Sequence, residues 1–85
     1  MLFKNLPQNT PFKLFEDYYQ NAENHNQPIA EAGCISSVDK DGNPHSRYVN
    51  FKYFFEDHLI FFSSYSSDKA KDFESNQNVA VNFWW

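Results

Sequence analysis

Three cations stand out in this acidic sequence as a set that could hold an anion. Arg47, the only arginine, and Lys52 lie at the two ends of a mainly apolar stretch, and Lys69 follows a run of serines. Free amides at a helix N-terminus, with capping serines and a nearby lysine, bind phosphate well. An arginine can add a bidentate grip on the same group. We therefore predict a phosphate site, with solvated surface charges as the alternative.

The spacing of Arg47 and Lys52 limits how the two could share one ligand. They are five residues apart in a predicted strand, and successive side chains of a strand point to opposite faces. Both can reach one ligand only if it lies along the strand edge, or if a β-bulge resets the alternation. The sequence leaves both arrangements open.

The other reactive groups do not form a recognisable site, and no catalytic residue is assigned. Cys34 is a lone cysteine beside Gly33, so we expect a buried small side chain rather than a nucleophile. No metal site is expected, because the histidines fall in predicted loops or turns without ligand spacing. These histidines are His25, His45 and His58. The carboxylates are interpreted as solvated charges on helix faces and turns; they are Glu16, Asp17, Glu31, Asp39, Asp41, Glu56, Asp57, Asp72 and Glu74.

Size and composition restrict the class of protein. The chain has 85 residues and a net charge of −4, enough for one small domain and unsuited to general nucleic-acid binding. Aromatic residues make up 20% of it, which argues against disorder. No apolar run approaches the roughly 20 residues that span a bilayer, and no signal-peptide core is present. We expect a soluble cytoplasmic domain without nucleic-acid or membrane partners.

The first third of the chain predicts an arm followed by a helix. Residues 1–10 are expected to be a flexible arm, because asparagines and Pro7 interrupt any pattern. Thr10 and Pro11 form a helix start, with a capping hydroxyl and then proline at the first position. An apolar stripe follows at helical spacing, and a loop is expected over residues 21–28. The stripe, interpreted as core packing, contains Phe12, Phe15, Tyr18, Tyr19 and Ala22.

The remainder predicts strands and one short helix. Alternating small residues indicate a strand from about residue 30 to Val38, and Asp39–Asn43 is a turn in which Gly42 takes positive φ. Further strands are expected over 46–55, 59–63 and 79–85, with a helix over 68–74. The order is helix, antiparallel three-strand meander, helix, strand, a mainly β fold with two helices. The aromatic end at Trp84–Trp85 predicts that another chain covers this edge or that the sequence is a fragment.

With these elements in place, the sequence resembles the pyridoxamine 5′-phosphate oxidase family of FMN-binding split barrels. The resemblance runs from about Pro11 to Trp85 and rests on five segments in the family's order. Its most specific part is Ser46–Lys52, an arginine, four mainly apolar residues and a lysine. The others are Pro11–Phe15, Ser37–Pro44, the pair Phe61–Ser64 and Ser67–Ala70, and Asn76–Trp85. Residues 11–85 are therefore expected to form a partial FMN-binding split β-barrel.

The resemblance implies a cofactor, a reaction and a set of contacts. Arg47 and Lys69 would hold the FMN phosphate, and Lys52 would lie near the flavin and the substrate phosphate. The family oxidises pyridoxamine or pyridoxine 5′-phosphate to pyridoxal 5′-phosphate: the flavin takes a hydride and oxygen reoxidises it. A homodimer is implied as well. The implied cofactor-binding set is Arg47, Tyr48, Val49, Asn50, Phe51, Lys52, Phe62, Ser63, Ser67 and Lys69.

Two features depart from the family pattern. Asp68 stands where the family usually has a phosphate-binding arginine, and an anion facing the phosphate would weaken binding. Family members are also roughly twice as long, and the missing half supplies most substrate-binding residues. The sequence therefore leaves alternatives open: a truncated oxidase, a non-catalytic flavin-binding or dimerising half-barrel, or another flavin- or haem-handling split barrel.

Overall fold

A computed structural model describes residues 1–63 and 68–85 of the chain. This part of the chain contains two helices and six strands, which confirms the predicted mainly β class with two helices. In chain order the elements are β1 (Leu2–Lys4), α1 (Pro11–Asn24), β2 (Ala32–Val38), β3 (Pro44–Asn50), β4 (Tyr53–Phe55), β5 (His58–Ile60), α2 (Asp68–Ser75) and β6 (Ala80–Asn82).

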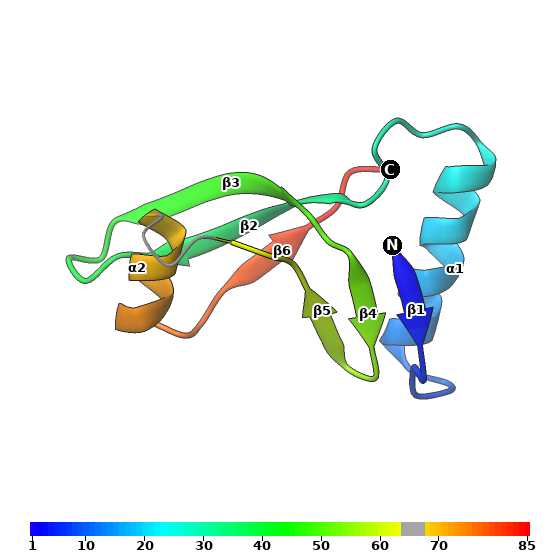
Figure 1. Cartoon of the computed structure of the whole chain (residues 1–85), viewed down its shortest axis with the longest axis horizontal. Helices are drawn as coiled ribbons and strands as arrows, with labels where there is room; N and C mark the ends of the chain where they lie inside the picture. The colour runs from blue at the N-terminus through cyan, green and yellow to red at the C-terminus, as the bar shows by residue number, and fades with distance from the viewer. Residues whose placement is uncertain (64–67) are drawn as a thin grey trace.

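The strands form two three-stranded sheets, ordered β1-β4-β5 and β3-β2-β6. Figure 1 shows an elongated molecule in which α2 lies beside the β3-β2-β6 sheet, while α1 lies beside β1 at the other end. The chain measures 40 × 26 × 20 Å along its principal axes. The predicted phosphate-binding residues belong mainly to the α2 end.

The β2–β3 hairpin forms as the sequence predicts. Ala32 to Val38 pair antiparallel with Asn50 to Pro44. At the turn, Oδ1 of Asp39 accepts hydrogen bonds from the amides of Asp41 and Asn43. Gly42 has φ of 85°, the left-handed conformation that glycine adopts without steric cost. The predicted turn chemistry is confirmed.

The strand predicted over 46–55 is wrong as a single element, because the chain leaves one sheet and enters the other within it. β3 ends at Asn50, and β4 begins at Tyr53 with β5 as its antiparallel partner. Phe51 and Phe54 are both buried, whereas a regular strand would put residues three apart on opposite faces. Two aromatic side chains thus reach the core at this spacing only because the strand breaks between them. The predicted order of the meander is kept, but its middle strand is divided into β3 and β4.

The N-terminal segment, predicted to be a flexible arm, contains strand β1. β1 pairs parallel with β4, and the amide of Leu2 donates to the carbonyl of Lys52 at 2.9 Å. Leu6 is buried. This parallel pairing joins residues about fifty apart in the sequence, so the local pattern of residues 1–10 contained no sign of it.

Both predicted helices form, with differences at their ends. α1 begins at Pro11 as predicted but continues through Asn24, into the segment predicted to be a loop. The hydroxyl of Thr10 does not cap it and instead donates to the carbonyl of Pro7 at 2.7 Å. α2 matches the predicted short helix to within a residue. β5 begins at His58, one residue before the strand predicted over 59–63, and ends at Ile60, whereas β6 occupies only part of the strand predicted over 79–85.

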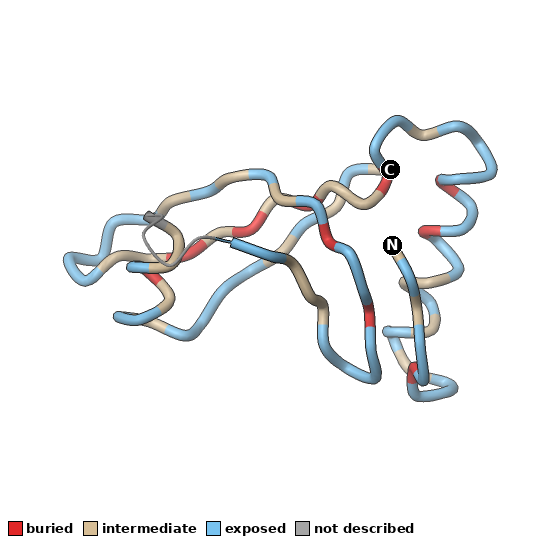
Figure 2. Tube along the Cα trace, viewed as in Figure 1, coloured by how far each residue is buried: buried red, intermediate tan, exposed pale blue. Residues whose placement is uncertain are grey.

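A continuous series of aromatic rings, buried at Phe51 and Phe54, runs through the molecule beside buried aliphatic residues such as Ile35. Each ring centroid lies 5.0–6.3 Å from the next, within the range of favourable aromatic contacts. Figure 2 shows that buried positions are scattered along both sheets and α1. The series therefore connects α1 to α2 through both sheets and explains the abundance of phenylalanine. In order it contains Phe3, Phe54, Phe15, Phe83, Phe51, Phe61 and Phe73.

Candidate functional site

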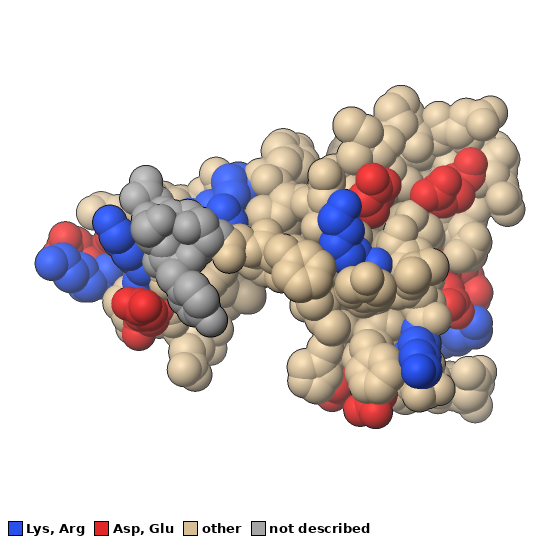
Figure 3. Space-filling model, in the orientation of Figure 1, with Lys and Arg blue, Asp and Glu red and all other residues tan. Residues whose placement is uncertain are grey.

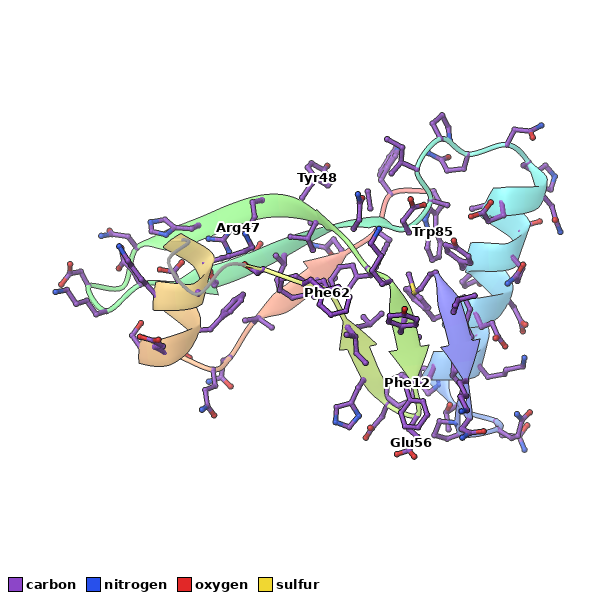
Figure 4. The ribbon with its side chains drawn as sticks, in the orientation of Figure 1. Phe12, Arg47, Tyr48, Glu56, Phe62 and Trp85 are labelled. Atoms are coloured by element: carbon purple, nitrogen blue, oxygen red, sulfur yellow. The ribbon has the colours of Figure 1, made fainter. Side chains whose placement is uncertain are left out.

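Arg47 lies on the face of β3 that α2 covers. Its Nη1 donates to Oγ of Ser37 at 2.7 Å, and its Nη2 lies 3.3 Å from Oδ2 of Asp72. Its side chain remains 21% exposed. Figure 4 shows Arg47 beside α2, while Tyr48 points away from that helix. The guanidinium is therefore fixed by two partners and still reaches solvent.

Asp72 is the centre of this cluster, and its prediction as a solvated helix-face charge is wrong. Its side chain is only 4% exposed, and Oδ2 also accepts from the Ser37 hydroxyl at 2.8 Å. Nδ1 of His45 lies 2.9 Å from the same oxygen and must carry a hydrogen, because a carboxylate only accepts. The Ser37 hydrogen bond, followed by those of His45 and Arg47, holds the pKa of Asp72 below its ordinary value against the opposing effect of burial.

His45 was predicted to lie in a loop or turn, and this prediction is wrong. It lies on β3, two residues before Arg47. Its side chain therefore lies on the same face of the strand as Arg47. Nε2 of His45 also lies 3.5 Å from Oδ2 of Asp39 in the hairpin turn. The imidazole thus connects the turn to α2.

Lys69 is the second residue of α2, and it is half-buried. It precedes Asp72 by three residues, a spacing that places two side chains on the same side of a helix. Because Asp72 faces Arg47, the helix side that carries Lys69 faces the same region. The structure thus brings the predicted arginine and the start of the predicted helix to one end of the molecule.

Lys52 does not join this cluster. It is exposed, as are Tyr48 and Asn50, whereas Arg47, Val49 and Phe51 are more buried. Regular alternation therefore continues through Lys52 and puts it on the face opposite to Arg47. The break in alternation falls after Lys52, so it does not bring the two cations together. Of the two arrangements left open by the sequence, only a ligand along the strand edge fits both residues.

The outer edge of β3 carries backbone groups that no other described strand pairs with. The pairs Asp39–Asn43 and Glu31–Phe51 are hydrogen-bonded at the two ends of the hairpin, so odd-numbered β3 residues bond to β2. The N–H and C=O groups of Tyr48 and Asn50 consequently point away from β2. Among the described strands none pairs with this edge. As far as residues 1–63 and 68–85 are concerned, this edge can therefore form hydrogen bonds to a planar ligand.

The other predicted contact residues have different surroundings. The side chain of Phe51 is buried in the aromatic series, and its amide donates to the carbonyl of Glu31, so neither is available to a ligand. Phe62 is 73% exposed, and Ser63 is exposed beside it. Ser67 lies outside the described residues. Figure 4 shows Phe62 between the two ends of the molecule rather than beside α2.

Other chemistries find little support in the described part of the chain. Within residues 1–63 and 68–85, no three metal-ligating side chains are arranged so that they could hold a metal ion. Cys34 is half-buried on β2 rather than fully buried as predicted. None of the described helices has the length and apolarity to cross a membrane. Figure 3 shows charged side chains gathered toward the two ends of the visible face, with an uncharged region between them. Within the cluster around Arg47, the partly exposed arginine side chain is the group that could bind an anion.

Sequence reasoning missed the residues that hold Arg47. Ser37 and Asp72 are 35 residues apart, and Asp72 is 25 residues from Arg47. No local periodicity reports contacts at such separations. The one available signal was that Asp72 follows Lys69 by three residues, on the helix face already expected to meet a ligand.

The chain has recognisable relatives among known proteins. A family model described as "Pyridoxamine 5′-phosphate oxidase" matches residues 22–85, most of the chain. The chain is 40% identical over 78 residues to pyridoxine/pyridoxamine 5′-phosphate oxidase 1 of Hydrogenovibrio crunogenus, covering 92% of this chain and 36% of that protein. It is 35% identical to the Flavobacterium johnsoniae enzyme, covering 100% of this chain and 40% of the relative. The chain thus spans less than half the length of these relatives.

Solved structures share the fold. PhzG from Burkholderia lata, crystallised with tetrahydrophenazine-1-carboxylic acid, superposes with a TM-score of 0.83 at 20% identity over 93% of this chain and 39% of that one. A pyridoxamine 5′-phosphate oxidase-related, FMN-binding protein from Nostoc punctiforme gives 0.75 at 20% identity, over 91% and 41%. The chain therefore has the architecture of part of a split barrel, as predicted.

Proposed function

The chain belongs to the pyridoxamine 5′-phosphate oxidase family, and on that premise we propose that it binds FMN as part of an oxidase acting on phosphorylated B6 vitamers. The substrate would be pyridoxamine or pyridoxine 5′-phosphate, and the product pyridoxal 5′-phosphate. FMN, when bound, supplies the acceptor for the hydride removed from the substrate.

The residues at the α2 end fit the phosphate of such a cofactor. Arg47 offers a partly exposed guanidinium whose orientation is set before any ligand arrives, and preorganised donors bind anions at lower cost. Of its five N–H groups, the contacts to Ser37 and Asp72 use two. Lys69 lies on the helix side that faces the same region. These two cations are the proposed phosphate ligands.

The rest of the proposed site follows the edge of β3. The unpaired backbone groups of Tyr48 and Asn50 can bond a flat, polar ring system, with Val49 between them in the strand. Lys52, on the opposite face from Arg47, is proposed to meet the substrate phosphate and the near edge of the flavin. Phe62 and Ser63 are exposed and remain proposed flavin contacts, as does Ser67.

Catalysis needs more than these residues supply. The relatives are more than twice as long as this chain, so we propose that substrate recognition depends on further polypeptide and on a second copy in a homodimer. The proposed setting is the cytoplasm. A non-catalytic flavin-binding or dimerising half-barrel is the alternative, and it predicts a dimer that FMN does not affect.

The observation that carries the proposal is the placement of Arg47 and the start of α2 on one face, in a chain of this family. We would titrate the protein with FMN, following flavin fluorescence, and measure the same for Arg47→Ala and Lys69→Ala. Glu74→Gln, an exposed change in α2, is the control. We expect quenching by the wild type at micromolar concentration, at least tenfold weaker binding by each alanine variant, and no change in the control.

A second measurement separates binding from turnover. The protein and FMN are incubated with pyridoxamine 5′-phosphate in air, and the absorbance of the aldehyde product is followed. Product would show that the chain turns over by itself, whereas binding without product is expected if catalysis needs further polypeptide. The non-catalytic alternative is supported by a dimer that FMN does not affect. An absence of FMN binding by the wild type would contradict the proposed cofactor, and sedimentation would then show whether a flavin-independent dimer is present.

A further inference from the structure

We propose that Asp72 is a positioning residue that aligns Arg47 and the start of α2 toward one anion. Its relevance to FMN depends on the proposed function, but the alignment itself is a property of the free protein. Asp72 touches no ligand in this proposal. It acts through Arg47, by holding the guanidinium, and through Lys69, by fixing the helix to the hairpin.

One carboxylate oxygen of Asp72 connects α2 to two strands through hydrogen bonds. Oδ2 of Asp72 in α2 accepts from Ser37 on β2, and from His45 and Arg47 on β3. Ser37 also accepts from Nη1 of Arg47. The guanidinium is thus held at two of its nitrogens by groups that are themselves bonded to each other. Such a closed network permits one orientation of the side chain.

Burial explains why Asp72 would hold Arg47 rather than release it to a ligand. Ser37 is 2% exposed and the Asp72 side chain 4%, so the carboxylate would be costly to leave without a cation. Its contacts with Ser37 and His45 keep it in place whether or not a phosphate is present. Arg47 retains N–H groups that neither partner uses. An arriving anion can therefore bind Arg47 without displacing Asp72.

The expected effect on affinity follows from the mobility of a free arginine. A long side chain that must be ordered on binding weakens the complex by roughly three- to tenfold, and Asp72 together with Ser37 orders Arg47 beforehand. Removing the negative charge acts in the opposite direction, because Asp72 also repels a phosphate. The two roles therefore predict opposite changes: weaker FMN binding if Asp72 positions Arg47, tighter binding if it competes with the phosphate.

The first test needs no ligand. Arg47 is the only arginine, so its guanidinium gives a single set of ¹⁵N-NMR signals. We expect slow rotation about the Cζ–Nε bond in the wild type and in Glu74→Gln. Asp72→Asn should show fast, averaged rotation, with circular dichroism used to check that the variant is folded. A freely rotating guanidinium in the wild type, or unchanged rotation in folded Asp72→Asn, overturns the proposal.

The second test compares FMN with riboflavin, which lacks the phosphate. We expect Asp72→Asn to bind FMN about tenfold more weakly and riboflavin within twofold of the wild type. In the Arg47→Ala background the Asp72→Asn change should have a smaller effect, because the part of its role that Asp72 exerts through Arg47 is already lost. Tighter FMN binding by Asp72→Asn, or equal losses for FMN and riboflavin, would each contradict a positioning role.

A second variant covers the case in which Asp72→Asn does not fold. Ser37→Ala removes one of the two contacts to Arg47 while keeping both charges, and it should also speed rotation and weaken FMN selectively. These measurements distinguish a failure of the proposed FMN binding from a failure of the positioning role. If wild-type protein has an ordered guanidinium but no affinity for FMN, the alignment stands and the cofactor does not. If Arg47→Ala weakens FMN binding and neither Asp72→Asn nor Ser37→Ala does, the cofactor stands and the positioning role does not.

Discussion

A Cβ atom placed on Gly33 would lie 2.8 Å from Cε2 of Phe51, closer than real side chains approach. It would also lie 2.9 Å from two ring atoms of Phe83. Gly33 is in β2, directly opposite Val49 of β3. The missing side chain therefore lets two rings of the aromatic series pack against the sheet that carries Arg47.

Gly33→Ala should destabilise the protein by about 1–3 kcal/mol, because buried rings must move to admit the methyl group. Urea unfolding followed by circular dichroism measures the change. Gly42→Ala is the comparison: it meets no atom within 4 Å but has φ of 85°, so it should cost about 1 kcal/mol through backbone strain. Near-ultraviolet aromatic signals should change for Gly33→Ala alone. Unaltered stability of Gly33→Ala would contradict this packing.

The stability of the protein should decline at acid pH partly through Asp72. Its pKa is lowered in the folded state from the ordinary 3.8, chiefly by the Ser37 hydrogen bond. The unfolded chain therefore takes up the proton first as pH falls, and the contribution of Asp72 is complete well above pH 3.8 and lost through the lower folded value. Thermal melting of wild type and Asp72→Asn should differ by several degrees at pH 7 and converge near pH 2. A pH-independent difference would count against this assignment.

Tyr19 should confer sensitivity to alkaline pH. Its hydroxyl accepts from the N-terminal amine of Met1 at 2.7 Å and donates to Glu23 at 2.6 Å. Burial, and then the hydrogen bond to Glu23, raise the pKa of Tyr19 above its ordinary 10.0. The hydroxyl therefore stabilises the fold below pH 10, and this contribution declines at higher pH as the unfolded chain ionises.

Tyr19→Phe should lose about 1–3 kcal/mol at pH 7, since both hydroxyl partners are charged groups. Unfolding free energies at pH 7 and pH 11 measure the effect. The deficit relative to wild type should shrink at the higher pH. Tyr18→Phe, at an exposed position on the same helix, is the control and should be neutral at both.

Arg47→Lys should not preserve the site. A lysine keeps the charge but lacks the planar fork that reaches Ser37 and Asp72 at the same time. We expect FMN affinity to drop about tenfold and riboflavin affinity to stay within twofold, measured by fluorescence titration. An FMN affinity equal to wild type would show that charge alone matters.

Asp68→Arg should strengthen FMN binding. Asp68 is the first residue of α2, and the family resemblance puts an arginine at this position. Exchanging an anion for a cation near a phosphate dianion favours binding by roughly tenfold at low salt, less at high salt. Isothermal titration at two ionic strengths measures both effects. Asp17→Arg, the same exchange at an exposed position of α1, controls for net charge.

The local chemistry of the chain determined the parts of the fold that depend on neighbouring residues. The turn at Asp39–Asn43 forms because Asp39 bonds amides two and four residues ahead, and because Gly42 tolerates positive φ. Helix α1 starts at Pro11 for an equally local reason. Alternation along β3 correctly separated Arg47 from Lys52.

Only the tertiary structure decided where the second predicted strand divides and what surrounds Arg47. Residues 46–55 favour one long strand locally, yet Phe51 and Phe54 both enter the core, which requires a break between them. The sequence predicted Asp72 to be a solvated charge on a helix face, but it is buried because α2 packs against the β2–β3 hairpin. Burial and long-range hydrogen bonds are made between segments 25 or more residues apart, so no pattern within a single segment encodes them.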